Sequence, residues 1–186
     1  MERQIMDAAA ELFAKNGFEA TSMDEVADKA GVAKGSLYYH FKGKSQLFAR
    51  TAVDGIQFIT RELQKSVNAA YSPQSAASQI IGLLVDICVD YARIADLVIA
   101  DATPGVDDED EQAILNAKQA LLSRVQWALG EGMSAGMVRS VDARPAAAGL
   151  LAFVYAYCKV AMAQPGATKQ TVKTRIMPII TKGLMY

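Results

Sequence analysis

Residues 21–48, with the sequence TSMDEVADKAGVAKGSLYYHFKGKSQLF, contain two short helical patterns joined by a glycine, and this stretch decides how the chain folds. Ser22 and Glu25 have the spacing of a capping box, which predicts the start of the first helix. Gly31 ends that helix, and the second helix is expected over residues 33–41. Two short helices joined by a tight turn have the dimensions of a helix-turn-helix.

The second helix of this pair carries side chains suited to contact with DNA. Gly35 lets the backbone approach a base edge, while the hydroxyls of Ser36, Tyr38 and Tyr39 can bond to bases or phosphates. Either tyrosine could instead lie in the core, because neighbouring residues of a helix point about 100° apart.

Three further features complete the expected DNA-binding surface. Leu37 and Phe41 lie four positions apart and are expected to anchor the second helix in the core. Lys44 stands at the start of the next helical pattern, where its ammonium and the backbone N–H groups can meet a phosphate. Residues 29–53 contain no acidic residue, so this part of the chain is expected to attract a polyanion.

Helical patterns continue outward from this stretch in both directions. Apolar residues recur at helical spacing, and glycine or proline separates most patterns from the next. We expect an all-α chain of eight or nine helices, in which an N-terminal three-helix helix-turn-helix module is joined to a larger C-terminal helical bundle. Outside the central stretch, the expected helices cover residues 2–16, 44–70, 74–102, 107–134, 142–162 and 168–184.

The expected domain boundary lies inside one continuous helix. Residues 1–48 form the predicted DNA-binding domain, and residues 49–186 form the predicted ligand-binding and dimerisation domain. The helix over residues 44–70 belongs to both and is the expected lever between them. The acidic run over residues 107–111 is expected at a helix N-terminus, where its charge meets the positive end of the helix dipole.

Composition excludes several classes of protein. The 186 residues are 52% hydrophobic and 21% charged, with a net charge of −1, as expected for a folded globular chain. Two cysteines and one histidine are too few for a disulfide framework or a histidine zinc site, so we expect no metal and no cofactor. The sequence has no glycine-rich phosphate loop and no HExxH motif, so we do not expect an enzyme.

The sequence also predicts a cytoplasmic protein with no membrane partner. Its N-terminus, MERQIMDAAAELF, mixes charged and apolar residues and lacks the apolar core of a signal peptide. The weakly charged run over residues 146–154 is far shorter than the ~20 residues that span a bilayer.

Residues 21–48 resemble the DNA-binding signature of the TetR/AcrR family of transcriptional regulators. The resemblance covers about the first quarter of the chain. Gly43 departs from it, because the family often has Asn, Ser or Asp there, and Ser45 replaces the usual acid, which is expected to leave the patch more basic. The matching positions are Thr21, Val26, Ala27, Ala30, Gly31, Val32, Gly35, Leu37, Tyr38, His40, Phe41, Lys44 and Leu47.

The resemblance implies roles for single residues at the DNA. His40 could also cap the C-terminus of its own helix, a role that its position equally suits. The implied base contacts are Lys34, Gly35, Ser36, Tyr38 and Tyr39, and the implied phosphate contacts are Thr21, His40 and Lys44.

The resemblance also implies a homodimer, formed through the last two helices, and a small-molecule site in the C-terminal bundle. The helix over residues 142–162 carries small and apolar residues along one stripe, as an interface requires. Asp86, Asp90 and Arg93 share one helix face, which lies against either solvent or a cavity. The candidate pocket residues, each of which could instead be plain core, are Phe58, Leu84, Cys88, Tyr91 and Trp127.

The expected function is therefore that of a ligand-responsive TetR-type regulator. As a dimer it would bind a palindromic operator in double-stranded DNA, and as a repressor it would be released by a small-molecule effector of unknown identity. The alternative is a DNA-binding activator or architectural regulator without a small-molecule ligand. An apolar bundle with no pocket would favour that alternative.

Overall fold

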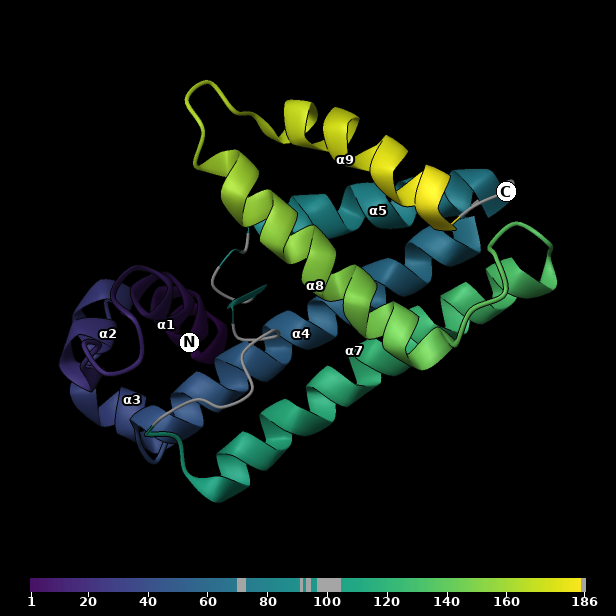
Figure 1. The fold of residues 1–186 in the computed structure, drawn as a ribbon. Helices are drawn as coiled ribbons and strands as arrows, with labels where there is room; N and C mark the ends of the chain where they lie inside the picture. Colours follow the sequence, from purple (N-terminus) through teal and green to yellow (C-terminus); the bar gives the residue numbers. More distant parts are fainter. Residues whose placement is uncertain (70–72, 91, 93–94, 97–104, 185–186) are drawn as a thin grey trace.

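The computed structural model describes the backbone of residues 1–186 apart from 70–72, 91, 93–94, 97–104 and 185–186. The described residues form eight α-helices, labelled here as in Figure 1, which confirms the expected fold class. The helices are α1 Glu2–Asn16, α2 Met23–Ala30, α3 Lys34–His40, α4 Lys44–Ala69, α5 Pro73–Asp90, α7 Asp108–Ser134, α8 Ala143–Met162 and α9 Lys169–Leu184.

Local sequence signals set the ends of several helices. Gly17 follows α1 with φ +84° and Gly31 follows α2 with φ +66°, a backbone conformation that glycine adopts most readily. Pro73 occupies the first position of α5, where its missing N–H removes no helical bond. Acidic residues fill the first turn of α7, as the helix dipole favours. The expected span of α5 beyond residue 90 lies mostly outside the described residues.

Helices α1 to α3 and the start of α4 enclose the core of the N-terminal module. Leu37 of α3 and Phe41, which directly follows α3, are fully buried in it, which confirms that this pair anchors the helix in the core. The rings of Phe13 and Phe18 each meet Phe48 of α4 edge-on, with centroids 5.0 Å apart in both pairs. The aromatic contacts thus join α1 and the segment after it to α4.

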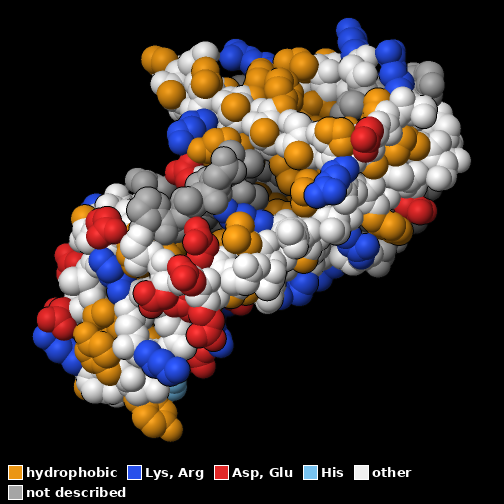
Figure 2. All heavy atoms as spheres, turned by 60° about the horizontal axis from the view of Figure 1, so that its bottom comes forward, with side chains coloured by type: hydrophobic (Ala, Val, Ile, Leu, Met, Phe, Trp, Pro, Cys, Tyr) orange, Lys and Arg blue, Asp and Glu red, His pale blue; other side chains and the backbone are white. Residues whose placement is uncertain are grey.

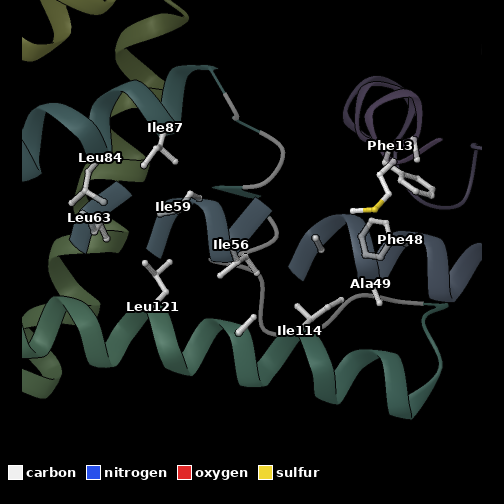
Figure 3. Packing of buried hydrophobic residues seen from close by; sticks show 14 of the residues in the cluster. Phe13, Phe48, Ala49, Ile56, Ile59, Leu63, Leu84, Ile87, Ile114 and Leu121 are labelled. Carbon is white, nitrogen blue, oxygen red and sulfur yellow. The ribbon is translucent and has the colours of Figure 1, made fainter. Parts of the chain in front are cut away.

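Helix α4 is shared by the N-terminal module and the C-terminal bundle. Its 26 residues span about 39 Å. It packs against α1 near its start and against α5 farther along, whereas α7 lies beside it from Ser45 onward. Figure 3 shows this change of neighbours: Phe48 faces Phe13 of α1, whereas Ile59 and Leu63 lie between α5 and α7. One hydrophobic core therefore runs from the module into the bundle.

Ion pairs connect α5 to α9 on the outside of the bundle. Lys173 Nζ lies 2.6 Å from Asp86 Oδ2, and Lys169 Nζ lies 2.7 Å from Asp90 Oδ2. Because these carboxylates are more than a third exposed, the pairs orient α9 more than they stabilise the fold. Arg93, expected on the same face, lies outside the described residues.

Helix α8 corrects one expectation about the C-terminal half. The run over residues 146–154 is only part of a 20-residue helix, and by length and composition alone this helix could cross a membrane. Only 17% of the most apolar 18-residue stretch of α8 is buried within the chain. A single helix of this kind is weak evidence for a membrane span, and an exposed apolar face also fits an interface with another protein.

Replacing Gly31 tests the turn between α2 and α3. Gly31→Ala should lower the free energy of unfolding by about 1 kcal/mol, because alanine is strained at a positive φ. The added Cβ would meet no atom within 4 Å, so a clash does not contribute. Gly31→Asn should be less harmful, since asparagine tolerates this conformation better. Chemical denaturation followed by circular dichroism measures both variants, and an unchanged stability for Gly31→Ala would contradict the assignment.

Candidate DNA-binding interface

Helix α2 begins with a complete capping box. The Ser22 hydroxyl accepts a hydrogen bond from the Glu25 N–H at 3.2 Å, and the Glu25 carboxylate accepts one from the Ser22 N–H at 2.8 Å. The hydrogen bonds from the Ser22 backbone and side chain lower the pKa of Glu25 below its ordinary value. The capping box fixes where α2 begins, and Gly31 then turns the chain into α3.

Helix α3 buries one side and presents the other to solvent. Leu37 and Phe41 hold it in the core, while Tyr39 is 87% exposed and Tyr38 is 52% exposed, so neither tyrosine belongs to the core. Gly35 is exposed as well, and a Cβ placed there would meet no atom within 4 Å. The outer side of α3 therefore offers phenol rings and a bare backbone, which suit the edges of bases in a major groove.

Lys34, expected to contact bases, is already paired within the chain. Its ammonium lies 2.6 Å from the Asp24 carboxylate, and both side chains are more than half exposed. The hydrogen bond to Asp24 raises the pKa of Lys34 above its ordinary value. The charge that Lys34 would bring to DNA is thus partly neutralised by Asp24 while the surface is unoccupied.

A surface hollow lies beside α3, at the start of α2. It has a volume of about 450 Å³ and is lined by residues 19–24, Tyr38 and Lys44. The Lys44 ammonium donates a hydrogen bond to the Glu19 carbonyl oxygen at 3.1 Å and lies 4.5 Å from the centroid of the Phe18 ring. A lysine, a phenol and the N-terminal end of α2 around one hollow can hold a phosphate.

Three expected contact residues are less exposed than the tyrosines. Thr21 is buried, and its hydroxyl donates a hydrogen bond to the Gly17 carbonyl oxygen at 2.8 Å. Ser36 is half-buried, and so is His40, whose ring stands edge-on to that of Tyr39 with centroids 5.4 Å apart. Phosphate contact by Thr21 and His40, and the capping alternative for His40, stay predictions.

The start of α4 contains contacts that sequence reasoning missed. The Gln46 side chain accepts a hydrogen bond from the Lys42 N–H at 2.8 Å, which fastens the residue before Gly43 to the first turn of α4. The Ser45 hydroxyl donates to Asp110 of α7 at 2.6 Å. The patch is therefore not simply more basic for lack of an acid at position 45, because α7 brings a carboxylate to the same place.

The candidate pocket residues of the bundle do not share one environment. Leu84 is buried in the core near Leu63, whereas Phe58 and Trp127 are about two fifths exposed. The Arg124 guanidinium lies over the Trp127 ring, 4.7 Å from its centroid. Tyr91, also expected to line a pocket, lies outside the described residues.

Cys88 is half-buried on α5, facing Cys158 of α8. Interaction with the Cys158 thiol, together with burial, raises the pKa of Cys88 above its ordinary value. A protonated thiol among apolar neighbours packs as a small hydrophobic group, so Cys88 fits core as well as a pocket wall.

Asp86 faces an open groove as well as α9. The groove has a volume of about 570 Å³ between α4, α5 and α9, and its polar lining includes Gln79, Asp86, Gln170 and Lys173. Asp86 and Lys173 neutralise each other across it. The groove thus offers hydrogen-bonding groups with no excess of either charge.

Comparison with known proteins identifies relatives of the N-terminal segment and of the chain. Residues 5–51 match the family described as "Bacterial regulatory proteins, tetR family". The chain is 36% identical over 70 residues to the HTH-type transcriptional repressor KstR2 of Mycolicibacterium smegmatis, covering 38% of this chain and only about a third, 34%, of KstR2. It is 22% identical to the HTH-type transcriptional regulator YhgD of Bacillus subtilis, over 98% of this chain and 96% of YhgD.

Solved structures share the fold over nearly the whole length. The transcriptional regulator FadR of Bacillus subtilis, solved in complex with stearoyl-CoA, has a TM-score of 0.81 at 18% identity and covers 98% of this chain and 99% of its own. The ketosteroid transcriptional regulator KstR2 of Mycobacterium tuberculosis has a TM-score of 0.77 at 18% identity, over 100% of this chain and 95% of its own. At this identity the likeness shows the fold: a helix-turn-helix module followed by a helical bundle.

Removing the partner of Lys34 should strengthen attraction to DNA. Asp24→Asn frees the Lys34 charge and takes a negative charge from the surface, so affinity for double-stranded DNA should rise by up to about tenfold at low salt. Asp7→Asn is the matched control, because Asp7 is as exposed as Asp24 but pairs with Arg3 on α1. Fluorescence anisotropy measures both, and an equal effect of the two substitutions would contradict the role given to Asp24.

Proposed function

Because the chain belongs to the TetR family of transcriptional regulators, we propose that it is a ligand-responsive repressor that binds a palindromic DNA operator as a homodimer. The relatives and the fold are those of transcription regulators and not of enzymes. The observation that carries the proposal is the exposure of Tyr39 and Tyr38 on a helix whose other side is anchored by Leu37 and Phe41.

In this proposal α3 enters the major groove. Tyr38, Tyr39 and Ser36 contact base edges or nearby phosphates, and Gly35 allows the backbone of α3 to approach closely. Lys44 holds a phosphate in the hollow beside α3. Residues 1–48 act as the DNA-binding domain, and residues 49–186 carry the dimer surface and the effector site.

The exposed faces of α8 and α9 support dimerisation. Phe153 and Val160 of α8 and Ile179 of α9 are 38%, 67% and 50% exposed. Figure 2 shows hydrophobic side chains spread over this face of the molecule. Between the two helices lies a groove of about 350 Å³ lined by apolar side chains and by the small residues Ala146 and Gly149. A second copy of the two helices would cover this surface, and a two-fold dimer matches a palindromic operator.

We propose that the effector is a small molecule bound in the C-terminal bundle. One structural neighbour was solved in complex with stearoyl-CoA and another is named a ketosteroid transcriptional regulator, so a ligand with a large apolar part is a reasonable first class to screen. Here α4 would transmit the change, because it packs in both the module and the bundle. The effector acts by binding better to the form of the dimer that fits the operator poorly.

An activator is the alternative that one relative supports. The HTH-type transcriptional activator FasR of Mycolicibacterium smegmatis is 49% identical over 45 residues, which cover 24% of this chain and 20% of FasR. Because the matches to KstR2 and FasR each cover a small part of those proteins, neither match decides between repressor and activator for this chain. A repressor and an activator would both act where the DNA lies, so we propose a cytoplasmic location in either case.

Loss of the Tyr39 side chain should weaken operator binding. An operator is first selected from randomised double-stranded DNA with the purified protein. Tyr39→Ala should then reduce the affinity for that operator by roughly 1–3 kcal/mol and leave the dimer intact. Trp127→Ala, which removes another exposed aromatic ring but on α7, is the control and should bind normally. An unchanged Kd for Tyr39→Ala in a gel-shift titration would remove Tyr39 from the interface.

A charge on the outer face of α9 should break the dimer. Ile179→Glu would bury an unpaired carboxylate against the second copy, which should weaken association by about 3–5 kcal/mol. Leu115→Glu is the control, because Leu115 is an exposed apolar residue on α7, away from the proposed surface. Light scattering coupled to size-exclusion chromatography measures the mass. A dimer that persists in Ile179→Glu would mean that α9 is not part of the interface.

A further inference from the structure

The start of α7 reaches across to the N-terminal module and contacts it at two points. At the first point, the Ser45 hydroxyl donates a hydrogen bond to Asp110 Oδ2 at 2.6 Å, and the Asp107 N–H donates one to Ser45 Oγ at 2.9 Å. A carboxylate at position 45 would face Asp110 with like charge, whereas a hydroxyl can both donate and accept there. Ser45 is thus suited to hold α7 against α4.

The second point of contact is Gly105, just before α7. Its φ is +81°, and a Cβ built on it would lie 2.5 Å from Glu19 Oε1 and 2.9 Å from Phe18 Cε1. The Glu19 carboxylate is the end of a flexible side chain and can move, but a Cβ at Gly105 would also overlap the edge of the Phe18 ring, so the backbone before α7 lies close against Phe18. We call these two contacts together the α7 clasp. In the first contact Asp107 and Asp110 bind Ser45, and in the second Gly105 lies against Phe18 and Glu19.

The same residues of the module hold Lys44. The Glu19 carbonyl accepts its hydrogen bond, the Phe18 ring lies under its ammonium, and Ser45 follows it in the chain. The α7 clasp therefore contacts Phe18 and Glu19, which hold the Lys44 ammonium, and also Ser45, the next residue in the chain. A lysine side chain held in one place loses less conformational entropy when it meets a phosphate.

We propose that Gly105 and Ser45 are positioning residues for DNA binding: through the α7 clasp they place the Lys44 ammonium for an operator phosphate. Neither residue needs to touch DNA. The inference rests on the proposed function, because it takes Lys44 as a phosphate contact. It adds a specific route by which the bundle, which contains α7, controls operator affinity.

Substitution of Gly105 with a matched control tests the proposal. Gly105→Ala should push Phe18 and Glu19 away and weaken binding to the selected operator about tenfold, and the slope of log K against log salt should fall by about one per protomer. Gly136→Ala is the control. Gly136 has φ +70°, so alanine is strained there in the same way, but its Cβ would meet no atom within 4 Å. Gly136→Ala should lower thermal stability and leave operator affinity unchanged.

A double-mutant cycle with Lys44→Ala separates positioning from a general loss of stability. If Gly105 acts through Lys44, Gly105→Ala should have almost no further effect on affinity once Lys44 is alanine. Ser45→Ala provides a second entry to the clasp without a clash, and its effect should vanish in the same background. All variants are made in the whole 186-residue chain, with folding checked by circular dichroism and oligomeric state by light scattering.

The outcomes separate the inference from the function beneath it. Equal operator affinities for Gly105→Ala and Gly136→Ala, or effects of Gly105→Ala and Lys44→Ala that simply add, would overturn the role of the clasp while operator binding stands. If the unmodified chain enriches no DNA sequence, the proposed operator binding is wrong, and the positioning role of the α7 clasp is overturned as well. A tenfold loss that disappears without Lys44 supports the inference.

Discussion

The burial of one side of α4 along most of its length is the constraint on which the rest of the structure depends. Phe48 and Ala49 are buried near its start, and Ile56, Ile59 and Leu63 are buried farther along. Each large apolar side chain removed from water contributes about 1.5–3 kcal/mol. Separating either the N-terminal module or the C-terminal bundle from α4 would therefore cost several such contributions. Because the helix is continuous, a change in how the bundle packs around Leu63 must move or strain the segment that carries Lys44.

All the described helices of the bundle contribute to its core, but α8 and α9 each leave one apolar side uncovered. The lysines of α9 pair with Asp86 and Asp90 of α5, and these pairs hold α9 so that its apolar side stands beside that of α8. A weak ion pair can therefore matter for assembly, because it aligns two apolar faces into one surface. The membrane-like composition of α8 has the same origin: a helix partly covered in the single chain carries apolar residues on nearly all sides.

The parts of the structure that local chemistry determines could be predicted from the sequence. The capping box at Ser22, the glycine after α2 and the spacing of Leu37 and Phe41 all act within a few residues, so they place the helix-turn-helix correctly. Contacts between distant positions could not be predicted: Ser45 meets Asp110, 65 positions away, and Asp86 meets Lys173, 87 positions away. Lys34 and Thr21 show a second limit of prediction from residue type. Both are of types that contact DNA, but the sequence does not reveal that Lys34 pairs with Asp24 or that Thr21 bonds to the Gly17 carbonyl.

The anchoring of α3 has a calorimetric consequence. Because Leu37 and Phe41 already hold the helix in the free chain, the Tyr39 ring is 87% exposed there, and the base contact proposed for it needs no folding step. Burial of that preformed ring removes apolar surface from water, which makes the heat-capacity change of association negative. Its size would reflect the contact surface alone. A reading helix that ordered on binding would add the much larger heat-capacity change of folding to the same measurement.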